Sequence, residues 1–113
     1  MASVEELKSQ YLNINKEFEN IDTITNVDDI KTSVLLCFDN AASELKSEIE
    51  IESDEFTAVC PWTNLPDFAR LRIEYGPQEL LIELKSLKFY LTSYRSVGIL
   101  QEEVVNQILE DLK

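Results

Sequence analysis

The chain has 113 residues, of which 44% are hydrophobic, and this length and composition predict one small domain with its own core. Its formal net charge of -12 argues against direct binding to nucleic acids or anionic membranes, because both depend on clustered Lys and Arg. With no histidine, two cysteines and two glycines, it excludes Cys-His catalysis, a four-cysteine zinc site and a glycine-rich phosphate loop. The acidic start "MASVEELKSQ" is unlike a signal peptide, so we expect a cytoplasmic protein with free thiols and no metal.

Residues 1–33 are predicted to form an N-terminal helical extension. Apolar residues at helical spacing predict a helix over residues 4–21, namely Leu7, Tyr11, Ile14, Phe18 and Ile21. The following "TNVDDIKTSVLLCF" is ambiguous, because its acidic start suits a helix whereas residues 34–38 suit a short strand. Cys37 lies in the apolar run "VLLCF", which is typical of a buried core thiol.

Three strands and then two helices are predicted for residues 34–113. Alternating patterns predict strands at "SEIEIES" and "FARLRIEY", and a third short strand at "ELLIE" after a turn at Gly76-Pro77. A helix is predicted from Lys85 to about Ser96, with Gly98 as its C-terminal stop, and a second amphipathic helix at "QEEVVNQILEDLK". This order predicts an α+β domain in which two helices cover one face of an antiparallel sheet.

The loop between the first two predicted strands contains a cysteine and an aspartate, each next to a proline. Pro61 and Pro66 each fix one φ angle, so this loop is stiff enough to hold a reactive group. Cys60 is either a small buried hydrophobe or a nucleophile. Asp67 is either a turn residue or a proton donor and acceptor for chemistry at Cys60. It would not generate the thiolate, because a nearby negative charge disfavours it.

Charged residues near the predicted helices have both a structural and a binding interpretation. Lys85, Lys88 and Arg95 form the densest basic cluster, which is either a solvated helix face or an anion site. Glu83 ends an apolar strand, where it is either exposed to water or accepts N–H groups of a ligand. Glu102 opens the last helix, where interaction with the helix dipole alone would explain it.

Four motifs carry a resemblance to a known family: "EFTAVCPWTNLPDF", "ELKSLKFY", "YRSVGI" and "QEEV". They occur in the order and spacing of the NADPH-dependent 7-cyano-7-deazaguanine reductases, the QueF nitrile reductases, which the chain resembles from about Cys37 to Leu112. Asn64 stands where the family pattern has Gly, and Gln101 stands where it has His. The resemblance implies the tunnelling fold (T-fold), whose sheets associate into barrels in homo-oligomers with sites between subunits. It also implies two further strands after the last helix, which residues 34–113 lack.

The resemblance also implies a reaction and a set of site residues. Cys60 would attack the nitrile of 7-cyano-7-deazaguanine to form a thioimidate, with Asp67 moving protons, and two NADPH molecules would reduce the adduct to 7-aminomethyl-7-deazaguanine for queuosine biosynthesis, a tRNA modification. Substrate-binding roles fall on Ile82, Glu83, Leu84, Gln101 and Glu102, and cofactor-binding roles on Lys85, Ser86 and Lys88. Two alternatives stay open: an amidinotransferase of the archaeosine type, which uses no NADPH, and a non-catalytic deazaguanine-binding or assembly subunit.

Overall fold

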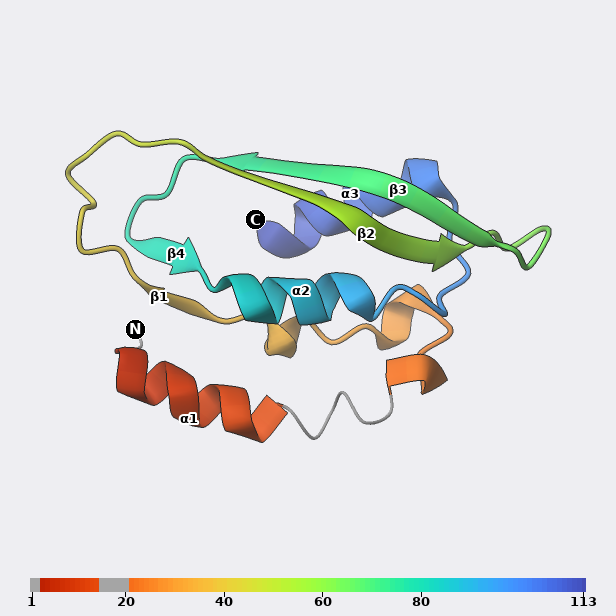
Figure 1. Ribbon diagram of the computed structural model, residues 1–113, viewed down its shortest axis with the longest axis horizontal. Helices are drawn as coiled ribbons and strands as arrows, with labels where there is room; N and C mark the ends of the chain where they lie inside the picture. The colour runs from red at the N-terminus through yellow and green to blue at the C-terminus, as the bar shows by residue number, and fades with distance from the viewer. Residues whose placement is uncertain (1–2, 15–20) are drawn as a thin grey trace.

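The computed structural model describes residues 3–14 and 21–113 and confirms the predicted α+β class (Figure 1). These residues contain three α-helices and four strands, with short 3₁₀ helices at Val27–Asp29 and Thr32–Val34 between the first helix and the first strand. The helices are α1 (Val4–Ile14), α2 (Leu84–Thr92) and α3 (Gln101–Leu112), and the strands are β1 (Cys37–Asp39), β2 (Ile49–Val59), β3 (Pro66–Tyr75) and β4 (Leu80–Ile82).

Strands β2 and β3 form a long antiparallel hairpin. One of its faces is exposed to water (the wet face), and the other packs against the core (the dry face). The predicted alternation is confirmed in β3, whose even-numbered residues are exposed while its odd-numbered ones are partly buried. On the wet face, Arg70 Nε lies 2.7 Å from Asp54 Oδ1 and Arg72 Nη2 lies 3.0 Å from Glu50 Oε2. The register shifts between Ser53 and Phe56, an irregularity of the kind that a β-bulge produces.

The prediction of a single sheet is wrong for the described residues, because β4 pairs with β1 and not with the hairpin. Cys37 lies opposite Ile82 in this second antiparallel pair. The turn after β3 is bound to the end of β1: Asn40 N donates to Glu79 O and Asn40 Nδ2 to Gln78 O, both at 2.9 Å. Because Cys37 lies in this short ribbon, it is exposed, and the prediction of a core thiol is wrong.

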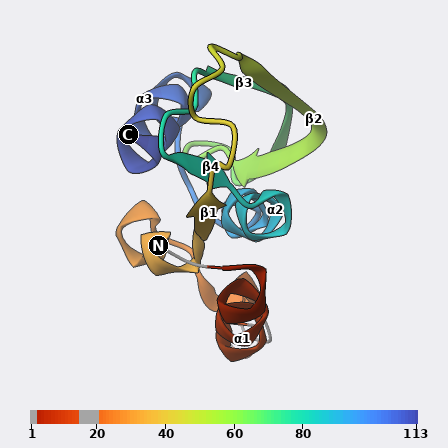
Figure 2. The same ribbon diagram turned by 90° about the vertical axis from the view of Figure 1, so that its left-hand side faces the viewer.

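The core lies between the dry face of the hairpin and helices α2 and α3, which lie on the same side of it (Figure 2). Its members in these elements are Phe56, Ala58, Leu87, Tyr90, Leu91, Val104 and Ile108. A polar network lies within it: the Tyr90 hydroxyl donates to Asp111 Oδ2 at 2.5 Å and lies 3.0 Å from the Tyr94 hydroxyl. This network joins α2 to α3, and the helices therefore meet through hydrogen bonds as well as apolar contact.

Helix α2 ends at Thr92, earlier than predicted, and Gly98 is not its C-terminal stop. Tight turns over residues 93–96 lead into an extended segment that runs beside the end of β2. Val59 N donates to Val97 O at 2.9 Å, and Ile99 N donates to Val59 O at 3.0 Å. Gly98 pairs with Val59 in this bridge, so the segment connects the end of α2 directly to the hairpin.

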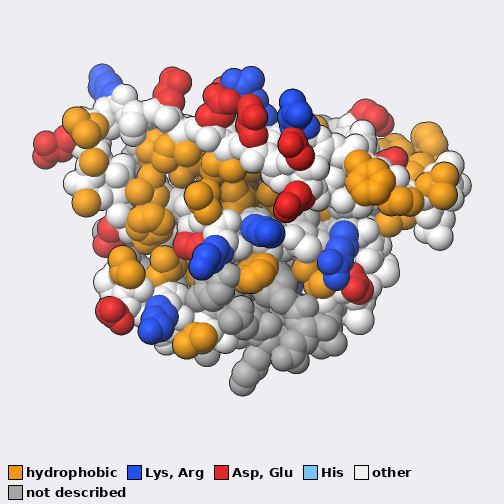
Figure 3. Space-filling view, in the orientation of Figure 1, with side chains coloured by type: hydrophobic (Ala, Val, Ile, Leu, Met, Phe, Trp, Pro, Cys, Tyr) orange, Lys and Arg blue, Asp and Glu red, His pale blue; other side chains and the backbone are white. Residues whose placement is uncertain are grey.

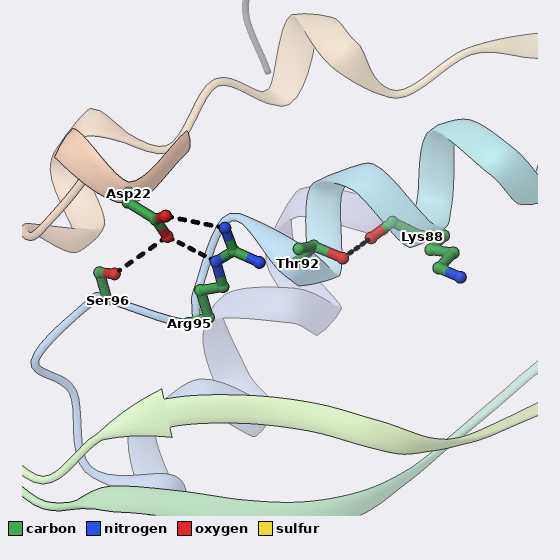
Figure 4. A network of polar contacts seen from close by, with 5 residues as sticks. All are labelled: Asp22, Lys88, Thr92, Arg95 and Ser96. Atoms are coloured by element: carbon green, nitrogen blue, oxygen red, sulfur yellow. Dashed lines mark hydrogen bonds and ion pairs between the residues drawn. The ribbon is translucent and has the colours of Figure 1, made fainter. Parts of the chain in front are cut away.

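The N-terminal region packs on the outside of this core. The predicted helix is confirmed over residues 4–14, while its continuation to residue 20 lies outside the described residues. Ile21 and Val34 are buried, and the Asp22 carboxylate binds Arg95 at 2.5 Å (Nε) and 2.8 Å (Nη2) (Figure 4). Gly98 N also donates to Thr25 O at 3.2 Å, so residues 21–34 are attached to the rest of the chain. The division into residues 1–33 and 34–113 stays a prediction.

Candidate functional site

Cys60 begins a single tight turn at the closed end of the hairpin. Asn64 N donates to Cys60 O at 2.8 Å, and Cys60 N donates to Leu65 O at 2.9 Å. Pro61 follows Cys60, where its missing N–H costs no hydrogen bond. Asn64 has a φ of 57°, in the left-handed region that Asn tolerates better than most residues. The backbone of the turn is thereby fixed on both sides of the thiol.

Polar groups of the turn affect the ionisation of the Cys60 thiol. The Thr63 hydroxyl, followed by the backbone N–H groups of Thr63 and Trp62, lowers the pKa of Cys60 below its ordinary value. Burial and the negative charge of Asp67 oppose this shift without cancelling it. In contrast, desolvation raises the pKa of Cys37. Of the two thiols, Cys60 is therefore the one favoured to react as a thiolate.

Asp67 lies on the same face of the hairpin as Cys60. It is the cross-strand partner of Ala58, and Ala58 and Cys60, two residues apart, project from the same face. Such diagonal neighbours are roughly 7–8 Å apart between Cα atoms. Asp67 is partly buried, and its charge acts on the Cys60 thiol. The structure thus brings together the two residues predicted to be catalytic.

The first turn of α3 lies at this same end of the molecule. The segment before it pairs with Val59, and Gln101 Nε2 donates to Phe68 O at 3.4 Å. Gln101 and the following Glu102 are both exposed. Two of the residues predicted to bind substrate are therefore at the same end of the hairpin as Cys60 and Asp67.

The other predicted substrate residues lie at the far end of α2. Ile82 ends β4, and Glu83 is the N-cap of α2, whose carboxylate accepts from Lys85 N at 2.6 Å and Ser86 N at 3.0 Å. Leu84, the first residue of the helix, is 60% exposed. Helix α2 has nine residues and is thus about 13 Å long, and its opposite end leads to the segment beside Cys60. Within one copy of the chain, the predicted substrate residues form two separate groups (Figure 1).

The residues predicted to bind NADPH lie on the first two turns of α2. Lys85 and Lys88 are exposed, and Lys88 Nζ lies 3.7 Å from Glu55 Oε2 in a loose ion pair. The two ammonium groups fit an anionic cofactor, because both can turn toward phosphate. Ser86 is buried, and its hydroxyl donates to Glu83 O at 2.8 Å and accepts from Leu36 N at 3.0 Å. Its hydroxyl is therefore occupied in fixing the start of the helix.

An apolar hollow of about 200 Å³ opens between α2 and the bulged part of β2 (Figure 3). Its walls include Phe56, Leu84, Leu87 and Leu91, and Lys88 and Glu55 also line it. Near Cys60, the closed end of the hairpin carries three large apolar side chains that are mostly exposed: Trp62 (81%), Leu65 (63%) and Phe68 (73%). Such exposed apolar groups are typical of surfaces that bind a partner or a ligand.

Residues 3–14 and 21–113 contain neither a membrane-spanning helix nor a group of side chains that could bind a metal ion. None of the helices there combines the length and the apolar character needed to cross a bilayer. In the same residues, no three acidic, cysteine or histidine side chains are grouped so that they could hold a metal ion.

The sequence prediction assigned no role to Thr63 or to the network of Tyr90 and Asp111. The order Cys-Pro-x-Thr contains a signal for the first of these, since it matches the first positions of a capped helical turn with proline second. The second carries no local signal, because Asp111 is 21 residues from Tyr90.

Comparisons with known proteins agree with the motifs in this site. Residues 66–113 match the family model described as QueF-like protein. An NADPH-dependent 7-cyano-7-deazaguanine reductase of Caldicellulosiruptor bescii is 55% identical over 83 residues, 74% of this chain and 63% of that protein. Proteins of the same name from Caldanaerobacter subterraneus (54% over 83 residues, 74% of this chain and 62% of that protein) and Prochlorococcus marinus (51% over 78 residues, 69% and 58%) are also similar. The chain thus spans about three fifths of the length of these relatives. Over the aligned residues, the chain is similar to members of the QueF family.

Proposed function

We propose that the chain acts in the NADPH-dependent reduction of the nitrile of 7-cyano-7-deazaguanine to 7-aminomethyl-7-deazaguanine, a step of queuosine biosynthesis. The names of its relatives support the substrate, the cofactor and the reaction. The observation that carries the proposal to this chain is the Cys60 turn, where donors lower the pKa of the thiol and Asp67 shares its face of the hairpin.

In the proposed reaction, the Cys60 thiolate adds to the nitrile carbon, and one C–N π bond breaks as the C–S bond forms. Asp67 takes up a proton from solvent and passes it to the nitrogen, which gives a thioimidate on Cys60. NADPH, when bound, supplies one hydride to this carbon in each of two rounds. Between them the C–S bond breaks and Cys60 leaves as a thiolate, so the protein is regenerated. In total, one nitrile group, two NADPH and two protons give one aminomethyl group and two NADP⁺.

Recognition of the deazaguanine ring would use carboxylates. Glu102 would accept two N–H groups of the guanine-like edge, a paired and charge-assisted contact. Gln101 would add a neutral hydrogen bond. Ile82, Glu83 and Leu84 would contribute from the start of α2, while the exposed lysines Lys85 and Lys88 would hold NADPH and Ser86 would fix the helix that carries them.

The separation of the two groups of substrate residues supports a homo-oligomer of the T-fold type with sites between subunits. The start of α2 in one copy would face Cys60 of another. Apart from the bridge at Val59, the outer edges of β2 and β3 pair with no strand among the described residues, and such edges favour association. Light scattering that gives a stable monomer at micromolar concentration would refute this assembly.

The proposed activity is tested by following NADPH absorbance after mixing the purified protein with 7-cyano-7-deazaguanine. We expect consumption that depends on the nitrile and disappears in Cys60→Ala but persists in Cys37→Ala, the matched control at the other thiol. A covalent adduct without NADPH consumption would instead favour the amidinotransferase alternative. Binding without an adduct or turnover would favour the non-catalytic alternative.

A further inference from the structure

We propose that the N-terminal helix α1 forms part of the cofactor site, and that Lys8 together with Lys85 binds the 2′-phosphate that distinguishes NADPH from NADH. The proposal deepens the proposed function and rests on it in taking NADPH as the cofactor. It gives a role to α1, in a region to which the sequence prediction assigned no part in the reaction.

A second apolar hollow, of about 270 Å³, lies between α1 and the start of α2. Its walls come from one face of α1 and from the residues at the start of α2, namely Val4, Leu7, Lys8, Leu12, Glu83 and Lys85. Positions 4, 8 and 12 are four residues apart, so their side chains share one face of the helix. Figures 1 and 2 show that α1 lies beside α2, on the side away from the hairpin. Helix α1 therefore presents three apolar side chains and one lysine to residues predicted to bind substrate and cofactor.

The two basic residues of this hollow, Lys8 and Lys85, are both exposed. Neither ammonium group forms an ion pair with a side chain that the structure describes, so both are available to an anionic ligand. Glu83 also lines the hollow, but its carboxylate is held by the Lys85 and Ser86 N–H groups. The two acidic residues in the first turn of α1 do not line it. Figure 3 shows basic side chains over both α1 and α2 on the same face of the molecule.

The size and charge of the hollow fit the adenosine end of NADPH. Pockets that hold a whole small ligand have roughly 300–1,000 Å³, so this hollow suits one end of a dinucleotide. A phosphate monoester carries a charge of about −1.5 to −2 at pH 7, which two ammonium groups balance. Leu7 and Leu12 offer the adenine an apolar surface. Because the hollow lies on the side of α2 away from the hairpin, it suits the end of the cofactor that does not react.

The test compares the affinities for NADP⁺ and NAD⁺, which differ only in the 2′-phosphate and bind without turnover. Both are measured by calorimetric titration of the whole chain. Lys8→Gln removes the positive charge and keeps a polar side chain. Lys113→Gln makes the same change of net charge at the end of the chain, where Lys113 Nζ lies 3.5 Å from Glu110 Oε2 and outside the hollow. Since the net charge of -12 already repels any anion, this control measures the general effect of losing one lysine.

We expect Lys8→Gln to bind NADP⁺ about tenfold more weakly, or more, while its affinity for NAD⁺ changes little. Lys8→Arg, which keeps the charge, should retain the preference for NADP⁺, and Lys113→Gln should bind both dinucleotides nearly as the parent does. Because Lys8 is exposed, these variants are expected to fold, which circular dichroism checks.

Equal NADP⁺ affinities in the parent and a folded Lys8→Gln would overturn the proposal. An equal loss of NADP⁺ and NAD⁺ affinity in Lys8→Gln would also overturn it, because Lys8 would then not contact the 2′-phosphate. So would an equal loss of NADP⁺ affinity in Lys8→Gln and Lys113→Gln, which would assign the effect to net charge. A parent protein that binds neither dinucleotide would refute the proposed cofactor as well, whereas a preference for NADP⁺ that does not depend on residue 8 would refute this inference alone.

Discussion

Glu83 has two interpretations that one pair of variants separates. In the structure its carboxylate caps α2 by accepting from Lys85 N and Ser86 N, whereas the family resemblance gives it a role in substrate binding. Glu83→Ala leaves both N–H groups without this acceptor, and loss of an N-cap costs about 1 kcal/mol of stability. For a chain of 113 residues this lowers the melting temperature by about 4 °C. Glu83→Ser removes the carboxylate but keeps a good N-cap oxygen, so we expect it to retain most of this stability.

Thermal unfolding followed by circular dichroism measures the first role, and calorimetric titration with 7-cyano-7-deazaguanine measures the second. If Glu83 also contacts substrate, Glu83→Ser loses affinity while keeping its melting temperature. Normal binding by Glu83→Ser would remove Glu83 from the substrate site and leave it as a cap. A melting temperature that does not change in Glu83→Ala would refute the capping argument itself.

Further predictions concern the core, the turn and the buried tyrosines. Leu87 is 2% exposed, so Leu87→Ala should cost about 2–5 kcal/mol in urea unfolding, and a cost below 1 kcal/mol would contradict its place in the core. Asn64→Gly should be tolerated at its positive φ, whereas Asn64→Val should destabilise the protein; equal stability of the two would contradict the left-handed turn. Tyr90→Phe should cost about 1–3 kcal/mol, because it removes the hydroxyl between Tyr94 and Asp111. Burial and then the Asp111 hydrogen bond raise the pKa of Tyr90. Its contribution to stability is thus present below the ordinary pKa of about 10 and is lost as the pH rises further, so its absorbance change should coincide with unfolding.

The sequence was most informative where a pattern repeats over many residues. Alternation in β3 and the spacing of apolar residues in α3 were sufficient to predict both elements, because burial of one face is decided locally. The nearness of Cys60 and Asp67 was also predictable, since two prolines and a dense motif define the turn between them, while their catalytic roles stay a prediction. The structure adds the register, in which Asp67 lies opposite Ala58, two residues before Cys60.

The remaining features depend on contacts between distant residues. Helix α2 ends at Thr92 because the chain then turns and Gly98 pairs with Val59 of β2. No residue between Thr92 and Gly98 signals this turn in the sequence. Cys37 is exposed because its strand pairs with β4, 45 residues further along, instead of entering the core. Glu83 was considered as a ligand contact or an exposed residue, but its capping role follows from where α2 begins, one residue earlier than predicted.

The central claim, that Cys60 is the nucleophile for a nitrile, is tested most directly by the intact mass of the protein after incubation with 7-cyano-7-deazaguanine without NADPH. Addition to the nitrile has no leaving group, so a thioimidate increases the mass by the full mass of the ligand. We predict this increase in the parent and in Cys37→Ala, and no increase in Cys60→Ala. An adduct on Cys60→Ala, or no adduct on a folded parent protein that binds the ligand, would contradict the account.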